Sequence, residues 1–292
     1  MKRTAAILLI ATLSPVAGAQ TNDAQTLYQN GRDAIMRGEP DRAAEYLEKA
    51  IALKPSNADY HYWLANAYGQ VAASAGMFRK MSMAKNAKTE WERAVQLDPD
   101  FISARFALLE FHVVAPGMFG GSESAAMEQA NEIRKRDPID GHRAFARIHT
   151  AAKKPDLARK EYADMVKKQP ASARAHYFLG VYLMLTEKNY KAASDEFESV
   201  VRLDPSYMAG YFQIGHVAAL AENDFARGEE TLKKYLAYRP KDEEPSSARA
   251  YYWLGAIYEK QGKKAEAKSN YAASQKINPN QKDVNAAMKR VS

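Results

Sequence analysis

The stretch ARAHYFLGVYLMLTEKNYKAASDEFESVVRLDP, residues 173–205, decides the fold of this chain. Its first half places Gly180 among large apolar residues, and its second half places Ala193 and Phe197 four residues apart, on one face of a helix. Pro205 then ends the second helix, because it lacks a backbone N–H and its ring clashes with the preceding turn. The stretch therefore predicts two helices joined by a turn.

The same spacing recurs along the chain at periods of 32 to 44 residues. A proline ends each of seven units: Pro55, Pro99, Pro138, Pro170, Pro205, Pro240 and Pro279. Twelve residues before each proline stands a small residue, in order Ala43, Ala87, Ala126, Ala158, Ala193, Gly228 and Ala267. Eight residues before it stands a mostly large one: Leu47, Trp91, Ala130, Tyr162, Phe197, Leu232 and Tyr271. Such a period is typical of stacked helical hairpins, which bury their apolar faces against one another.

The first helices of the units share a second signature. Two units show it most fully, with Trp63, Leu64, Ala65 and Tyr68 in one and Tyr251, Leu254, Gly255 and Tyr258 in the other. Gly31, Gly180 and Gly215 hold the same small position as Gly255. Together these residues resemble the tetratricopeptide repeat, whose pattern is Trp-x-x-Leu-Gly-x-x-Tyr followed by Ala, Phe and Pro over 34 residues. The resemblance covers about residues 24–281 and implies an all-α fold, a right-handed α-solenoid of about seven helix-turn-helix repeats.

We expect one elongated domain rather than several, because a solenoid builds its core from neighbouring repeats. Lys241 to Ser247 reads as a polar spacer before the last repeat. A capping helix at 282–292 is expected to cover that repeat's exposed face. The predicted repeats are 24–57, 58–101, 102–138, 139–172, 173–207, 208–241 and 248–281.

The first twenty residues have a different character. Lys2 and Arg3 precede an apolar stretch, 5–13, that is too short to span a bilayer. Val16-Ala17-Gly18-Ala19 then offers a small-x-small cleavage site. This order predicts a secretory signal peptide, residues 1–19, cut after Ala19, with an uncleaved membrane anchor as the alternative.

The mature chain is therefore expected in a bacterial periplasm or outside the cell, without stable membrane insertion. It contains no cysteine, so neither a lipid-modified cysteine nor a disulfide can form, and stability must come from packing. Removal of Lys2 and Arg3 lowers the net charge from +7 to +5. This mild basicity, outside the cytoplasm, does not favour a nucleic-acid partner.

Two segments depart from the plain period. The second unit carries an insertion, Val71 to Lys88, that combines four apolar residues with Arg79, Lys80, Lys85 and Lys88. The apolar residues are Met77, Phe78, Met81 and Met83. The insertion is expected to extend a helix or to form a short helical excursion. Such a surface suits varied apolar partners or an anionic membrane, and the alternative is that it covers the core of a neighbouring repeat.

The third unit carries Ala115-Pro116-Gly117-Met118-Phe119-Gly120-Gly121-Ser122, a turn with a helix start at Ser122. It lacks the Lys-Ser/Thr ending of a phosphate loop and follows no strand, so we expect no nucleotide there. The turn is similar to one in exported bacterial tetratricopeptide proteins, including the soluble T component of some TRAP transporters.

The sequence offers no catalytic or metal-binding pattern. His61, His142 and His176 occupy the position where the repeat family places its first-helix Trp, and core packing accounts for them. His142 and His149 are about 10 Å apart along a helix, too far to share a metal ion without other ligands. No His-x-x-x-His pair, Cys or nucleophile elbow is present. We therefore expect no enzymatic activity, no metal and no cofactor.

The resemblance also implies a binding surface. In the tetratricopeptide family the second, fifth, ninth and twelfth positions of each repeat line the concave side. The fifth position corresponds here to Tyr28, Tyr62, Phe106, Arg143, Tyr177, Phe212 and Tyr252. The ninth corresponds to Arg32, Asn66, Glu110, Arg147, Val181, His216 and Ala256.

Six of the seven fifth positions are aromatic, and Arg143 and Arg147 lie four residues apart. This pattern predicts a groove for an extended peptide, with rings covering apolar side chains and guanidinium groups binding a carboxylate. The alternatives are that the fifth-position tyrosines are partly structural and that the two Arg are solvated.

Two functions are compatible with these features. The first is an exported, non-enzymatic scaffold or adaptor that binds proteins or extended peptides in the bacterial cell envelope. The second is a small-molecule-binding accessory of a transport system. A pocket closed by the Met-rich insertion would favour the small molecule, and an open continuous groove would favour a peptide.

Overall fold

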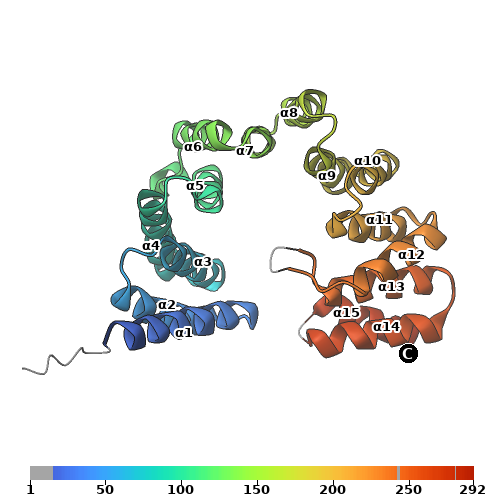
Figure 1. The fold of residues 1–292 in the computed structure, drawn as a ribbon, viewed down its shortest axis with the longest axis horizontal. Helices are drawn as coiled ribbons and strands as arrows, with labels where there is room; N and C mark the ends of the chain where they lie inside the picture. Colours follow the sequence, from blue (N-terminus) through green and yellow to red (C-terminus); the bar gives the residue numbers. More distant parts are fainter. Residues whose placement is uncertain (1–15, 242–243, 280) are drawn as a thin grey trace, which may run out of the picture. The chain divides into compact units, whose positions relative to one another are not determined.

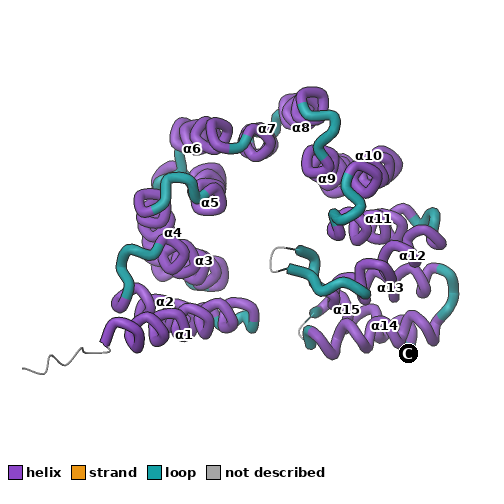
Figure 2. The backbone as a smooth tube through the Cα atoms, viewed as in Figure 1, coloured by secondary structure: helices purple, strands orange, loops and turns teal. Residues whose placement is uncertain are grey.

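The computed structural model describes residues 16–241, 244–279 and 281–292, with side chains from Asp23 onward. Throughout these ranges the regular elements are helices, and no strand occurs among them (Figure 2). The all-α solenoid predicted from the repeat pattern is thus confirmed. Most of the expected signal peptide lies outside the described residues, and α1 begins at Val16.

The helices form seven successive hairpins and one terminal helix (Figure 1). Their bounds are α1 (Val16–Met36) with α2 (Pro40–Leu53), α3 (Ala58–Ser74) with α4 (Met77–Leu97), α5 (Ile102–Val114) with α6 (Glu123–Arg136), α7 (Pro138–Ala151) with α8 (Pro155–Lys168), α9 (Ala173–Tyr182) with α10 (Tyr190–Leu203), α11 (Met208–Ala221) with α12 (Phe225–Leu236), α13 (Ser247–Lys260) with α14 (Lys264–Ile277), and α15 (Lys282–Val291). Two short turns accompany them, the 3-10 turn η1 (Gly117–Phe119) and the π-helical turn η2 (Leu183–Glu187).

The chain divides into two compact units, Met1–Asp137 and Pro138–Ser292. The first unit holds the hairpins from α1 to α6, and the second holds those from α7 to α14 together with α15. A repeat array permits such a division, because each repeat contacts only its neighbours and no central core holds the whole chain together.

The repeat prolines mark the helix ends. Six of the seven second helices end two residues before their proline, as α10 does at Leu203 ahead of Pro205. The exception is α12, which ends at Leu236, four residues before Pro240. At the end of the chain, α15 buries Val284, Ala287 and Val291 in the core of the last hairpin.

The small residues of the repeat pattern are the points of closest helix packing. The six alanines that precede the prolines by twelve residues have at most 1% of their surface exposed. A Cβ added to Gly180 would lie 2.7 Å from Phe197, and one added to Gly215 would lie 2.2 Å from Leu232. Gly31 faces Leu47 and Gly255 faces Tyr271 in the same way. The glycine of each such first helix therefore receives the large residue that stands eight positions before the proline.

A repeated polar contact, here called the latch, joins a first helix to the second helix of its own hairpin. The fourth residue of the predicted repeat contacts a Glu or Gln nine residues before the proline. The pairs are His61 with Glu90 at 2.5 Å, Arg105 with Gln129 at 3.1 Å, His142 with Glu161 at 2.6 Å and His176 with Glu196 at 2.5 Å. Three latches also reach the carbonyl oxygen of the preceding hairpin's proline: His61 to Pro55, Arg105 to Pro99 and His176 to Pro170.

The geometry around His61 favours a charged ring. Its Nδ1 faces the Glu90 carboxylate and its Nε2 lies 2.9 Å from the Pro55 carbonyl oxygen, so both nitrogens meet acceptors. Burial of the ring opposes the charge, but the hydrogen bonds to Glu90 and Pro55 outweigh it and raise the pKa of His61. In the His142 latch, Nε2 lies 3.5 Å from the Lys168 ammonium.

The glycine contact gives a first test. Gly215→Ala should lower the free energy of unfolding by about 1–3 kcal/mol, because the added methyl group overlaps the buried Leu232 side chain. Gly69→Ala is the matched control within a helix. Its Cβ would meet Trp91 at 3.6 Å, an ordinary contact, so it should be neutral or stabilise by about 0.5–1 kcal/mol. Denaturant unfolding followed by circular dichroism measures both, and equal shifts would contradict the packing described.

The His61 latch gives a second test. The raised folded-state pKa means that His61 contributes stability below its ordinary pKa of about 6.5, and that this contribution is lost as the pH rises through the folded-state value. His61→Leu should therefore cost more unfolding free energy at about pH 5.5 than at about pH 9. His149→Leu, outside the latches, is the control and should cost less at both. An equal loss for His61→Leu at both pH values would show that its charge contributes nothing.

Candidate functional site

In the first unit the predicted positions contact one another along the first helices. Tyr28 stacks on Tyr60 with ring centroids 4.9 Å apart, and the Arg32 guanidinium lies 4.7 Å from the Trp63 ring. Tyr62 packs against Phe101 at 4.9 Å. These contacts join α1 to α3 and α3 to the start of α5. Tyr28 and Tyr62 therefore contribute to the packing between successive first helices.

The other three predicted residues of the first unit differ in their contacts and in their exposure. Asn66 accepts a hydrogen bond from the Trp91 indole at 3.0 Å, so it secures α4 against α3. Phe106 is half-buried and Glu110 is exposed, both on α5. The structure therefore places all six positions on first helices but does not gather them into one pocket.

In the second unit, a cation and an aromatic ring form the contact between α7 and α9. The Arg143 guanidinium lies 3.8 Å from the centroid of Phe178, and that of Arg174 lies 5.5 Å from it. Asp140, which is 5% exposed, pairs with both guanidinium groups. Arg143 is thus held by a buried carboxylate, and Arg147 lies half-buried one turn further along α7.

The contact between α9 and α11 centres on Tyr177. Gln213 donates a hydrogen bond to its hydroxyl at 3.2 Å, and the ring of Tyr207 lies 5.3 Å away. Burial raises the pKa of Tyr177 and raises that of Tyr207 to about 12, with Tyr177 contributing to the latter. Both hydroxyls are therefore protonated at neutral pH and can donate hydrogen bonds.

His216 and Trp253 form the contact between α11 and α13. Their rings are stacked with centroids 4.1 Å apart, and the Arg249 guanidinium lies 5.4 Å from the Trp253 ring. Burial, aided by the charge of Arg249, lowers the pKa of His216 to about 4. The imidazole is therefore neutral at pH 7, and its Nδ1 lies 3.1 Å from the Gln213 side-chain oxygen.

The remaining two predicted residues contribute mainly to the core. Phe212 is buried and packs on Tyr235 at 5.4 Å. Tyr252 is half-buried between Trp253 and Tyr271, with the Arg249 guanidinium 4.7 Å from its ring. We call the half-buried rings and guanidinium groups at the second, fifth, sixth and ninth repeat positions of α7, α9, α11 and α13 the first-helix face. Its members are Arg143, Arg147, Arg174, Tyr177, Phe178, His216, Arg249, Tyr252 and Trp253.

Sequence reasoning missed part of this face. Arg174 and Arg249 stand at the second position of their repeats, which the family pattern already names as lining. Phe178 and Trp253 stand at the sixth position, directly after the mapped aromatic, and so does Trp63 in the first unit. An aromatic pair at positions five and six, as in Tyr62-Trp63 and Tyr252-Trp253, was the signal available.

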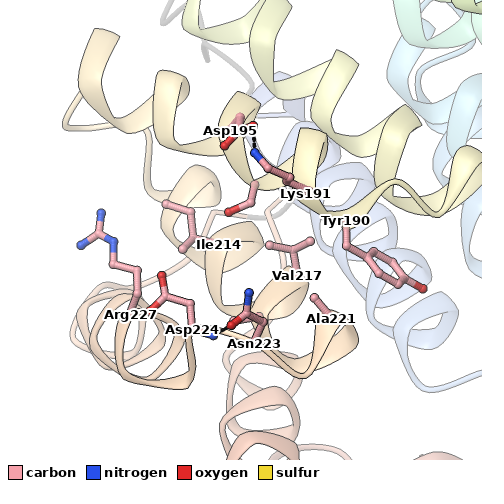
Figure 3. A pocket seen from close by; sticks show the side chains of 11 residues that line it. Tyr190, Lys191, Asp195, Ile214, Val217, Ala221, Asn223, Asp224 and Arg227 are labelled. Carbon is pink, nitrogen blue, oxygen red and sulfur yellow. Dashed lines mark hydrogen bonds and ion pairs between the residues drawn. The ribbon is translucent and has the colours of Figure 1, made fainter.

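Two pockets lie away from the first-helix face. One of about 390 Å³ lies between α10, α11 and α12, where Lys191 pairs with Asp195 at 3.2 Å (Figure 3). Another of about 280 Å³ lies between α2, α3 and α4 and is bordered by Arg79 and Met83 of the insertion. Both are open to solvent, and neither is lined by any of the twelve predicted positions.

The two irregular segments take simple forms. The insertion lengthens α3 and α4, with Met77, Phe78 and Met81 exposed rather than buried over a neighbouring core. In the third repeat, Ser122 caps α6 by accepting a hydrogen bond from the Ala125 N–H. A Cβ at Gly121 would lie 1.7 Å from the Ala115 carbonyl oxygen, so only glycine fits this turn.

Two negative findings concern the described residues alone. Among them, no three His, Cys, Asp or Glu side chains come together in a way that could hold a metal ion. None of their helices combines the length and the apolar character needed to cross a bilayer.

Two known protein families match parts of this chain. Residues 143–207 and 217–281 match the tetratricopeptide repeat family. Together these two matches span most of the second unit. In the first unit, residues 40–113 match the family described as regulator of microtubule dynamics protein 1-3. A comparison with curated protein sequences finds no match.

Solved structures share the tetratricopeptide architecture. A tetratricopeptide repeat protein from Parabacteroides merdae ATCC 43184 is 15% identical, with 92% of this chain and 99% of that chain covered and a TM-score of 0.50. Yeast Tom70 is 15% identical over 95% of this chain, with a TM-score of 0.72, and this chain spans 54% of its length. Human IFIT1 with PPP-AAAA is 18% identical over 87% of this chain and 59% of its own, with a TM-score of 0.53. Identities this low establish the fold alone.

Proposed function

We propose that this protein is an exported, non-enzymatic adaptor that binds other proteins or extended peptides in the bacterial cell envelope through its first-helix face. The observation that carries the proposal is the strip of half-buried rings and guanidinium groups on four successive first helices of the second unit. An extended chain laid across these helices would meet guanidinium groups on α7 and rings on α9, α11 and α13.

The chemistry of the strip favours a peptide that carries acidic and apolar side chains. Arg143, Arg147, Arg174 and Arg249 bring four positive charges, whereas Asp140 pairs with Arg143 and Arg174, and Asp283 pairs with Arg249. Rings such as Tyr177 and Trp253 add apolar surface, and the Tyr177 hydroxyl can hydrogen-bond to a peptide backbone. Because the rings are held by contacts between neighbouring helices, little side-chain entropy remains to be lost on binding.

The alternative is a small-molecule accessory of a transport system, and it rests on the similarity of the turn at residues 115–122 to one in exported transport components. It requires a pocket that encloses its ligand. The pocket of about 280 Å³ that the insertion borders is open to solvent, and it contains the Asp41 partner of Arg79. We therefore favour the peptide-binding adaptor.

Binding should depend on the charge of Arg147. This residue is chosen because substituting Arg143 would leave the buried Asp140 with one partner fewer and would confuse binding with stability. Arg147→Glu should reduce the capture of partners from a periplasmic extract by about tenfold or more, as expected for the loss of a charge-assisted hydrogen bond. Quantitative mass spectrometry of the captured proteins measures the change.

Lys191→Glu is the matched control, because it makes the same charge change in the same unit on the second helix α10. Its side chain is 88% exposed and pairs only with the neighbouring Asp195. Both variants should keep the wild-type circular-dichroism spectrum, and binding is compared at a temperature well below the melting temperature of each. Equal partner lists for wild type and Arg147→Glu would remove the first-helix face from the mechanism.

Export is tested separately. The basic start, the apolar stretch and the Ala-Gly-Ala site predict that the chain, expressed in a Gram-negative host, is found in the periplasm with Gln20 as its first residue. Cell fractionation and N-terminal sequencing measure this. Recovery of the uncut chain from the cytoplasm would contradict the proposed location and leave peptide binding untouched.

A further inference from the structure

The α3–α4 hairpin is longer than its neighbours. Helix α4 has 21 residues, whereas α5, which follows it after a short connection and runs back along it, has 13. About eight residues of α4, roughly 12 Å at 1.5 Å per residue, therefore extend beyond the last turn of α5. We call residues 77–81 at this end the α3–α4 tip.

The tip exposes large apolar side chains. Phe78 is 90% exposed, the highest value among the large hydrophobic residues described, and Met77 and Met81 are 66% and 40% exposed. Residues 77, 78 and 81 stand at i, i+1 and i+4 of one helix and therefore share a face. Nothing within the described chain covers them, although burial of one such side chain is favourable by about 1.5–3 kcal/mol.

The α3–α4 hairpin itself carries only basic charge around the tip, whereas Asp41, Glu45 and Glu48 of α2 lie near Arg79. From Tyr60 to Thr89 the chain contains no Asp or Glu, but it contains Arg79, Lys80, Lys85 and Lys88. Arg79 pairs with Asp41 and Lys88 with Glu92, while no described carboxylate pairs with Lys80 or Lys85. Apolar side chains therefore stand at the end of a projecting hairpin, with basic side chains beside and behind them.

We propose that the α3–α4 tip binds the surface of an anionic phospholipid bilayer, with Met77, Phe78 and Met81 among the acyl chains near the interface. Arg79, Lys80 and Lys85 then lie close to lipid phosphate groups. Apolar residues in the interface combined with basic residues at the headgroups are the features by which a helix binds such a surface without crossing it.

The shape of the tip favours a bilayer over a protein partner. A stable protein interface buries about 800 Å² on each side, supplied by about 20–30 residues. Three apolar side chains on a projecting end do not provide such an area, whereas a fluid bilayer deforms around them. The attraction also grows with each basic residue, even where no fixed partner faces it.

Vesicle flotation with the purified full chain tests the proposal. The chain should float with vesicles of phosphatidylglycerol and phosphatidylcholine, and much less with phosphatidylcholine alone or at high salt. Met77→Ser with Phe78→Ser should raise the lipid concentration for half-maximal binding by about tenfold or more. Lys80→Glu with Lys85→Glu should do the same on anionic vesicles only. All variants are made in the full chain, so that residues 1–19 contribute equally to each.

Two control variants match these changes away from the tip. Leu185→Ser with Ile277→Ser removes apolar side chains that are 51% and 53% exposed in the second unit. Lys191→Glu with Lys268→Glu reverses the same amount of charge there. Both should bind vesicles as wild type does, and all four variants should keep the wild-type melting temperature, because the altered side chains are exposed.

A spectroscopic variant reports directly on the tip. Phe78→Trp should add a fluorescence component that shifts to shorter wavelength on vesicle addition and is quenched by brominated acyl chains, as expected for an indole in the interface. Equal vesicle binding by wild type and the Met77→Ser, Phe78→Ser variant would overturn the proposal. So would a tip that binds no vesicles but whose substitution abolishes capture of a protein, since the occupant would then be that protein.

Discussion

Every hairpin of this chain depends on the close approach of two helices at a small residue. Where the first helix offers glycine, as at Gly180 or Gly215, the large residue of the second helix fills the space that a Cβ would take. The alanines that precede the prolines by twelve residues are buried in the same interfaces. The proline ends the second helix, so that the next hairpin begins at a repeatable place. The first-helix face lies on the first helices that this contact holds in place.

The latches show how the array tolerates polar residues at a position where the tetratricopeptide pattern has Trp. A buried imidazole or guanidinium is costly unless each of its polar atoms finds a partner. Glu90, Gln129, Glu161 and Glu196 supply that partner from the second helices. Three prolines add their carbonyl oxygens, so the residue that ends one hairpin also fastens the next.

The first-helix face is largely preformed, and this has a cost for recognition. Its cations are already engaged, Arg143 with Asp140 and Phe178, and Arg249 with Trp253 and Asp283. A ligand carboxylate must therefore share these guanidinium groups with their present partners. The groups are held in place, which limits the entropy lost on binding, but their charge is partly neutralised before a ligand arrives.

The sequence predicts the fold in more detail than it predicts the site. Helix ends and packing contacts follow from spacings such as that between Ala193 and Pro205, because they arise within one hairpin. The latch partners are 19 to 29 residues apart on the two helices of one hairpin, and their pairing depends on how those helices pack. The Arg174 to Asp140 pair spans 34 residues and depends on how successive hairpins pack. The sequence likewise does not reveal that Phe78 is exposed. Periodicity indicates which helix face is apolar, but only the short α5 beside a long α4 leaves that face uncovered.

The latch at His61 lies between hairpins as well as within one, because it reaches back to Pro55. In a linear array, contacts between neighbours determine how many repeats unfold together, whereas contacts inside a repeat determine only its own stability. Loss of the His61 proton therefore weakens the coupling of the first hairpin to the second. We expect an alkaline medium to make unfolding less cooperative, with the N-terminal hairpin fraying while the hairpins beyond it remain folded.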